Sequence, residues 1–226
     1  MGEPDRSGDR RPIAVRQWKV FQHAAGWLAR RGVSPNGISV AGMVCGLAAG
    51  GALAATPYLA GPGQRVAWVA AAVLIQLRLL ANMLDGMVAI EGGRGSPVGE
   101  LYNEVPDRVS DAATFIGAGY ALGGEVVLGY AAACVALFTA YVRAMGKAAG
   151  AGQEFCGPMA KQQRMFIVTV AAAYGGLAPR GWQPAWGPSP SWGLVAAALV
   201  LIIVGGLWTA GRRLGRIAAA LRKHGP

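Results

Sequence analysis

Acidic and amide side chains flank a glycine-rich turn near the middle of the chain. Asn82 and Asp85 precede the turn, and Asn103, Asp107 and Asp111 follow it at intervals of four residues. These offsets place each group on one face of a helix. Oxygen ligands suit Mg²⁺, Mn²⁺ or Ca²⁺ rather than zinc. The spacing therefore predicts two neighbouring helices that present oxygen atoms to each other and to a hard cation.

Pairing with arginine is the alternative for these acids. Arg78, Arg94 and Arg108 lie near them in the sequence, and plain ion pairs would satisfy the same charges. Ionisable groups near membrane depth usually line a cavity or a functional site. The local pattern alone leaves both interpretations open.

The composition indicates which elements position these side chains. Of 226 residues, 54% are hydrophobic and 14% are charged, whereas soluble domains average about 25% charged residues. The 35 glycines suit membrane helices, in which small residues allow backbones to approach closely. We therefore expect an all-α integral membrane protein and exclude an ordinary soluble domain.

Six apolar runs are long enough to cross a bilayer, since about 20 helical residues span its core. Ahead of them, apolar residues recur at helical spacing opposite basic ones, which is typical of a helix lying in the membrane interface. The predicted crossings are 38–60, 66–90, 98–122, 126–145, 161–177 and 192–210. The predicted organisation is a disordered tail at 1–12, an amphipathic juxtamembrane helix at 13–33, a six-helix transmembrane catalytic domain at 34–211 and a basic cytoplasmic tail at 212–226.

Basic residues gather on one side of these crossings. Seven precede the first span and five follow the last, whereas the opposite side carries Arg65 and Arg180. Positive residues mark the cytoplasmic side, so we expect a multi-pass protein of the cell membrane with both termini and the acidic helix ends in the cytoplasm. The net charge of +10 therefore reports topology, and nucleic acid binding is not expected.

The residues around the turn resemble the signature of the CDP-alcohol phosphotransferase family, also called CDP-alcohol phosphatidyltransferases. That signature reads Asp-x-x-Asp-Gly-x-x-Ala-Arg, a short loop, then Gly-x-x-x-Asp-x-x-x-Asp. The matching positions are Asp85, Gly86, Ala89, Gly99 and Asp107. The segment 34–39 is also similar to the start of the family's first span, and the resemblance extends from residue 31 to about 173.

Three positions depart from the signature. Asn82 and Asn103 stand where the family has its first and third aspartates, and Ile90 stands where it has arginine. An asparagine oxygen can bind a metal but carries no charge, so two of four negative charges are missing. We expect weaker metal affinity or the loss of one of two ions. Glu91, Glu104 and Asp111 could restore charge, and Asp107 with Asp111 could replace the final pair of the signature if the register slips by one helical turn. The ungapped register is preferred because Gly99 then fits as well.

The resemblance implies a Mg²⁺ or Mn²⁺ ion that bridges the diphosphate of a CDP-linked lipid. Asp107 would be the general base toward an acceptor hydroxyl. The implied metal ligands are Asp85, Asp107, Asn82, Asn103 and Asp111, and the implied nucleotide-binding residues are Asn82, Asp85, Gly86, Ala89 and Gly99. Arg143, Lys161 and Arg164 are candidates for an acceptor phosphate, or are ordinary positive-inside charges.

The expected reaction joins CDP-diacylglycerol to a polar alcohol and releases CMP. The basic loop favours a phosphorylated acceptor, with glycerol 3-phosphate preferred and inositol phosphate next. One alternative is a family member that has lost catalysis and only binds the CDP-lipid. Another is a small membrane transporter, although the acids gather at one membrane face. Glycine-rich spans also make a homodimer plausible.

Overall fold

The computed structural model of the chain describes residues 19–92, 98–152, 154–187 and 192–224. These residues form seven α-helices, two short 3-10 helices and one antiparallel pair of two-residue strands. In chain order the elements are α1 (Lys19–Arg30), α2 (Pro35–Ala55), η3 (Thr56–Tyr58), α3 (Gly61–Glu91), α4 (Gly99–Tyr120), α5 (Val126–Ala148), α6 (Lys161–Leu177), η4 (Arg180–Trp182), β1 (Ala185–Trp186), β2 (Trp192–Gly193) and α7 (Leu194–His224).

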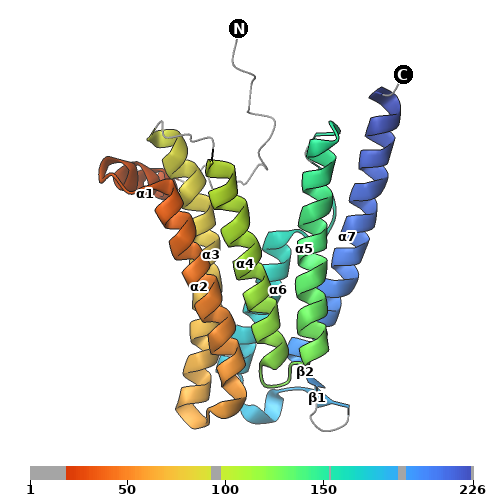
Figure 1. Cartoon of the computed structure of the whole chain (residues 1–226). Helices are drawn as coiled ribbons and strands as arrows, with labels where there is room; N and C mark the ends of the chain where they lie inside the picture. Colours follow the sequence, from red (N-terminus) through yellow and green to blue (C-terminus); the bar gives the residue numbers. More distant parts are fainter. Residues whose placement is uncertain (1–18, 93–97, 153, 188–191, 225–226) are drawn as a thin grey trace.

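Helices α2 to α7 run side by side, and α1 lies across one end of the bundle at an angle to α2 and α3 (Figure 1). Ala25 and Leu28 of α1 pack against Met83, Met87 and Val88 of α3. Helix α1 covers part of the segment predicted as an amphipathic helix, while residues 13–18 and the predicted tail at 1–12 lie outside the described residues. Its position in a membrane interface stays a prediction.

Each of the six predicted crossings coincides with one helix from α2 to α7. Among the described residues, four helical segments are long and apolar enough to cross a membrane, at Pro35–Tyr58, Gly61–Glu91, Val126–Ala148 and Leu194–Lys223. The remaining two are α4, which carries the acidic side chains, and α6, which has 17 residues. Four apolar helices thus support a membrane protein, and six crossings remain a prediction. Helix α7 continues through the basic segment to His224.

Glycines bring α2 and α4 into close contact. A methyl carbon at Gly50 would lie 2.3 Å from the carbonyl oxygen of Ala113, and one at Gly46 would lie 2.2 Å from the β-carbon of Ser110. Only glycine fits such an approach of two helices. Because α2 also packs against α3, this contact fixes the start of α4 beside the end of α3.

The apolar core joins helices α2 to α7, and five of them contribute large side chains. Leu53, Ile75, Phe115, Met165 and Leu199 come from α2, α3, α4, α6 and α7 and are at most 1% exposed. Tight burial of large side chains from separate helices fixes their relative positions. The polar residues of α3, α4 and α6 are thereby held in one place.

Candidate active site

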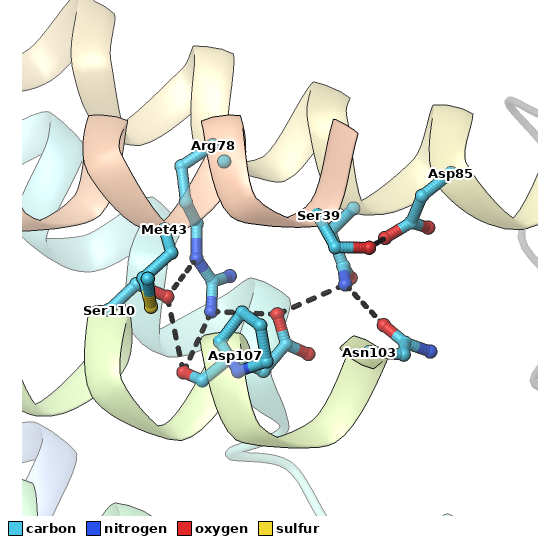
Figure 2. Close-up of a pocket in the computed structure, with 10 residues that line it drawn as sticks. Ser39, Met43, Arg78, Asp85, Asn103, Asp107 and Ser110 are labelled. Carbon is cyan, nitrogen blue, oxygen red and sulfur yellow. Dashed lines mark hydrogen bonds and ion pairs between the residues drawn. The ribbon is translucent and has the colours of Figure 1, made fainter. Parts of the chain in front are cut away.

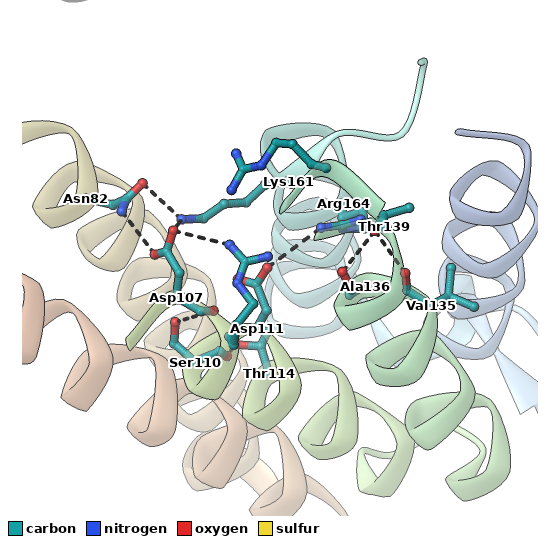
Figure 3. Close-up of polar contacts among 12 residues, drawn as sticks. Asn82, Asp107, Ser110, Asp111, Thr114, Val135, Ala136, Thr139, Lys161 and Arg164 are labelled. Atoms are coloured by element: carbon teal, nitrogen blue, oxygen red, sulfur yellow. Dashed lines mark hydrogen bonds and ion pairs between the residues drawn. The ribbon is translucent and has the colours of Figure 1, made fainter. Parts of the chain in front are cut away.

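Helices α3, α4 and α6 bring four of the predicted site residues together. Asn82 donates hydrogen bonds from Nδ2 to Oδ1 of Asn103 at 2.9 Å and to Oδ1 of Asp107 at 3.0 Å. Lys161 donates from Nζ to Oδ1 of Asn82 at 2.9 Å and forms an ion pair with Asp107 (Figure 3). We refer to Asn82, Asn103, Asp107 and Lys161 as the outer cluster. The side chains of Asp107 and Lys161 are 13% and 17% exposed, so this cluster is accessible.

Asp85 enters the same region from α3, one helical turn beyond Asn82. Ser39 of α2 donates from Oγ to Oδ2 of Asp85 at 2.6 Å, and the backbone N–H of Gly86 donates to Oδ1. Figure 2 shows Ser39 and Asp85 beside Asn103 and Asp107 around one small pocket. The sequence carried no separate signal for a contact of Ser39 with Asp85, because the two residues are 46 positions apart.

A second group of charges lies deeper between the helices. Arg78 forms ion pairs with Asp111 and with Asp107, the latter at 3.2 Å. Arg164 donates from Nη1 to Oγ1 of Thr139 at 2.7 Å, and its Nη2 lies 3.8 Å from Oδ2 of Asp111 (Figure 3). We refer to Arg78, Asp111 and Arg164 as the inner cluster. All three residues are at most 3% exposed.

The inner cluster changes the interpretation of two predicted site residues. Asp111 was predicted as a metal ligand and Arg164 as a ligand of an acceptor phosphate. The structure pairs Asp111 with both Arg164 and Arg78, and neither Asp111 nor Arg164 lines the pocket beside Asp107. One arginine considered as a partner for the acids, Arg78, is thus paired with Asp111, while the metal-binding role of Asp111 and the phosphate-binding role of Arg164 stay predictions. Ion pairs of this kind satisfy charges that cannot reach water.

The other predicted phosphate ligands are more accessible. Arg143, near the end of α5, forms an ion pair with Glu104, and its guanidinium carbon lies 5.8 Å from the ring centroid of Phe155. The Arg143 side chain is 23% exposed. Lys161 contacts the outer cluster directly. Two of the three predicted phosphate ligands thus lie around α4, on either side of its acidic face.

Three small residues were predicted to leave room for a nucleotide. Gly86 and Ala89 lie in the last turns of α3, and Gly99 begins α4. All three are partly exposed, and the pocket beside Asp107 is not lined by them. Residues 93–97 between these helices lie outside the described residues. The nucleotide-binding role of the three small residues stays a prediction.

The donor atoms permit a test of the predicted metal. Within the described ranges, no group of three or more His, Cys, Asp or Glu side chains is arranged to hold an ion. Asp85 and Asp107 line the pocket as carboxylates, and Asn82 and Asn103 add amide oxygens. Mg²⁺ commonly binds one or two carboxylates together with substrate phosphate oxygens. The residues therefore fit a divalent cation shared with a diphosphate, and not one that the protein alone encloses.

A long apolar groove leads to the outer cluster. It has a volume of about 640 Å³ and is lined mainly by α3 and α6, with Phe21 of α1 at its edge. This volume is typical of ligand-binding clefts. Asn82 and Lys161 form one polar part of its wall, and Gln76 and Thr169 form another. The groove thus combines an apolar body with two polar side chains of the outer cluster.

Comparisons with known proteins give a consistent set of relatives, although no protein-family model matches the chain. The chain is 32% identical over 165 residues to a phosphatidylinositol phosphate synthase of Streptomyces avermitilis, and the match covers 70% of the chain and 64% of that protein. It is 30% identical over 155 residues to an archaetidylinositol phosphate synthase of Aeropyrum pernix, covering 69% and 74%. The chain thus spans less than two thirds of the Streptomyces protein and about three quarters of the Aeropyrum protein.

Solved structures show the same fold. A phosphatidylinositol phosphate synthase of Mycobacterium tuberculosis with CDP-DAG bound superposes with a TM-score of 0.69 at 23% identity, covering 88% of the chain and 94% of that structure. Another structure of that synthase, in complex with manganese and citrate, gives a TM-score of 0.68 and covers 87% and 88%. At this identity the likeness concerns the arrangement of the helices.

Proposed function

Because the chain belongs to the CDP-alcohol phosphatidyltransferase family, we propose that it transfers the phosphatidyl group of CDP-diacylglycerol to a phosphorylated alcohol and releases CMP. The observation that carries this proposal is the groove that reaches the outer cluster. A lipid with a diphosphate head has the same two parts, an apolar body and a charged end. Asp107 and Lys161 lie at the place where the charged end would rest.

The reaction needs a base beside the acceptor hydroxyl. A carboxylate of Asp107 accepts the hydroxyl proton, and the acceptor oxygen forms a bond to the lipid-linked phosphorus. The bond from that phosphorus to the CMP oxygen breaks, and CMP leaves with the electron pair. Asn82 and Lys161 supply N–H groups that stabilise the phosphate oxygens. These residues therefore position the lipid phosphate next to the base.

A divalent cation fits between the substrate and the two carboxylates. Asp85 and Asp107, with oxygens of Asn82 and Asn103, would hold Mg²⁺ or Mn²⁺ together with the diphosphate. When bound, such an ion neutralises the charge that develops on the departing CMP. Gly86, which has no side chain at the end of α3, leaves space for the cytidine.

Inositol phosphate is the acceptor that we propose. The sequence pattern alone favoured glycerol 3-phosphate, but the relatives described above are named for inositol phosphate lipids. Lys161 and Arg143 are the basic side chains that would bind the acceptor phosphate, because both retain exposure. Arg164 would support this acceptor site only indirectly, by holding α6 against α4 through its contact with Asp111.

We also propose that the protein crosses the cell membrane six times, with the site on the cytoplasmic side. The basic helix α1 and the basic end of α7 lie at the same end of the bundle (Figure 1). Lysine and arginine favour the cytoplasmic side. A homodimer remains part of this proposal, because large apolar side chains such as Val44, Leu47 and Phe138 are exposed.

The test is CMP release from CDP-diacylglycerol by the purified protein with Mg²⁺ or Mn²⁺. The acceptors to compare are inositol phosphate, glycerol 3-phosphate, inositol, serine, glycerol and choline. Release of CMP with inositol phosphate and with no other acceptor supports the proposal. Release with a different acceptor would correct the proposed alcohol and would leave the proposed transfer reaction in place. If CDP-diacylglycerol binds and no acceptor produces CMP, the chain is a binding protein that has lost catalysis.

A further inference from the structure

A polar pair interrupts the apolar wall of the groove. Gln76 of α3 donates a hydrogen bond from Nε2 to Oγ1 of Thr169 of α6 at 2.8 Å. Thr169 in turn donates to the carbonyl oxygen of Met165 at 2.8 Å. Both polar side chains line the groove among apolar neighbours such as Val73 and Leu77. Polar groups in an apolar span are unfavourable unless they have partners or a function.

The pair leaves part of the glutamine amide open to the groove. An amide side chain can donate two hydrogen bonds and accept two. Within the described part of the chain, Gln76 makes one hydrogen bond, to Thr169, and its side chain is exposed. A pair that only ties two helices together would not require an exposed amide. A donor and an acceptor therefore face whatever fills the groove.

The position of the Gln76 amide along the groove indicates which part of a bound lipid it contacts. Gln76 precedes Asn82 by six residues, which is about 9 Å along a helix. In CDP-diacylglycerol the diphosphate is followed by the glycerol carbons and then by the ester carbonyls of the acyl chains. With the lipid phosphate at the outer cluster, the ester linkages pass the amide of Gln76. A dialkyl ether lipid has no carbonyl oxygen at this place.

We propose that Gln76, oriented by Thr169, donates a hydrogen bond to an ester carbonyl of the lipid substrate and thereby makes the enzyme prefer diacyl over dialkyl ether lipids. This inference rests on the proposed function. The free N–H of Gln76 donates to the carbonyl oxygen of an ester, whereas an ether has no carbonyl oxygen and leaves this N–H without a partner. A specificity of this kind arises because an unpaired polar group in an apolar site is unfavourable.

The experiment compares two lipids with the full-length protein in lipid nanodiscs. CMP release is measured with CDP-diacylglycerol and with its dialkyl ether analogue of the same chain length, and kcat/KM is determined for each. We expect the wild type to prefer the ester roughly fivefold, as one neutral hydrogen bond would give. Gln76→Leu should make the two values of kcat/KM nearly equal, because it removes both the hydrogen bond to the ester and the unpaired N–H that opposes the ether.

Two further variants make the comparison specific. Gln163→Leu introduces the same change at an exposed position of α6 outside the groove, and it should keep the wild-type ratio of ester to ether. Thr169→Val removes the hydroxyl that orients Gln76 and should reduce the ratio even if Gln76→Leu does not fold.

Each outcome separates this inference from the proposed function. Turnover of neither lipid would overturn the proposed function and the inference with it. Equal turnover of both lipids by the wild type would overturn the inference and keep the function. A preference for the ester that persists in Gln76→Leu and Thr169→Val would show that another residue recognises the carbonyl.

Discussion

The outer and inner clusters use the same chemical groups in different surroundings. The outer one joins Asp107 and Lys161 with two amides, and its charged side chains are 13% and 17% exposed. The inner one joins Asp111 with two arginines that are 2% and 3% exposed. Charges next to water can exchange their partners for a substrate, whereas buried charges depend on the partners they have. From this difference in exposure we expect the outer cluster to take part in chemistry and the inner cluster to contribute to stability.

Arg78 connects the two clusters. Its Nη2 contacts Asp107 at 3.2 Å and also pairs with Asp111, and its Nε donates to Ser110 at 2.9 Å. A buried arginine with three partners on α4 holds that helix in register with α3. The inner cluster thus positions the aspartate that the outer cluster uses. Changes in the two clusters should have separable effects on stability and on turnover.

Replacing Asp107 should produce the largest loss of turnover. Asp107→Asn keeps the shape of the side chain but removes the base, so kcat should fall by roughly 10²- to 10⁴-fold. Binding of CDP-diacylglycerol should persist, because Asn82 and Lys161 remain. CMP release and lipid binding are measured on the same preparation. Equal loss of binding and turnover would contradict a role as base.

Replacing Asp111 should instead affect stability. Asp111→Asn leaves Arg164 without its buried counter-charge and leaves Arg78 with Asp107 as its remaining one, which should lower the free energy of unfolding by about 3–5 kcal/mol. Denaturation in detergent measures this effect, and CMP release per folded molecule should change little by comparison. If Asp111→Asn is as stable as the wild type but releases no CMP, Asp111 takes part in catalysis. The two clusters would then not differ in role as proposed.

Replacing Lys161 tests whether the outer cluster binds the phosphate of the acceptor. Lys161→Met removes a charge that contacts Asn82 and Asp107, and we expect KM for a phosphorylated acceptor to rise by roughly 10- to 100-fold, as for a lost hydrogen bond to a charged group. Lys161→Arg serves as the control that retains the charge. An unchanged KM with weaker CDP-lipid binding would assign the lysine to the lipid phosphate.

Restoring a carboxylate should have the smallest effect. Asn103 is exposed and accepts a hydrogen bond from Asn82, so Asn103→Asp adds a negative charge without removing a contact. The concentration of Mg²⁺ or Mn²⁺ for half-maximal CMP release should fall by roughly fivefold, about 1 kcal/mol for one charge near water. The ion titration of wild type and variant measures this shift. A higher ion requirement would mean that Asn103 does not face the cation.

The sequence predicted much of the fold because its signals are local. Apolar runs of sufficient length indicate membrane helices, and each predicted crossing overlaps a helix from α2 to α7, with four segments among the described residues long and apolar enough to cross a membrane. The spacing of Asn103, Asp107 and Asp111 placed these residues on one face of α4, and the structure keeps them there. Helix periodicity depends on the few residues on either side, so it can be read along the chain.

Tertiary structure alone decided which of these side chains act together. Asp107 and Asp111 look equivalent in the sequence, yet Asp107 pairs with the partly exposed Lys161 and lines the small pocket, whereas Asp111 is buried between Arg78 and Arg164. The pair of Gln76 and Thr169 joins positions 93 residues apart and has no local pattern. The sequence by itself determined the helices, their membrane character and the faces that carry the acids. Partners and burial depend on how separate helices pack, because the surroundings of a charge are set by residues distant in the chain.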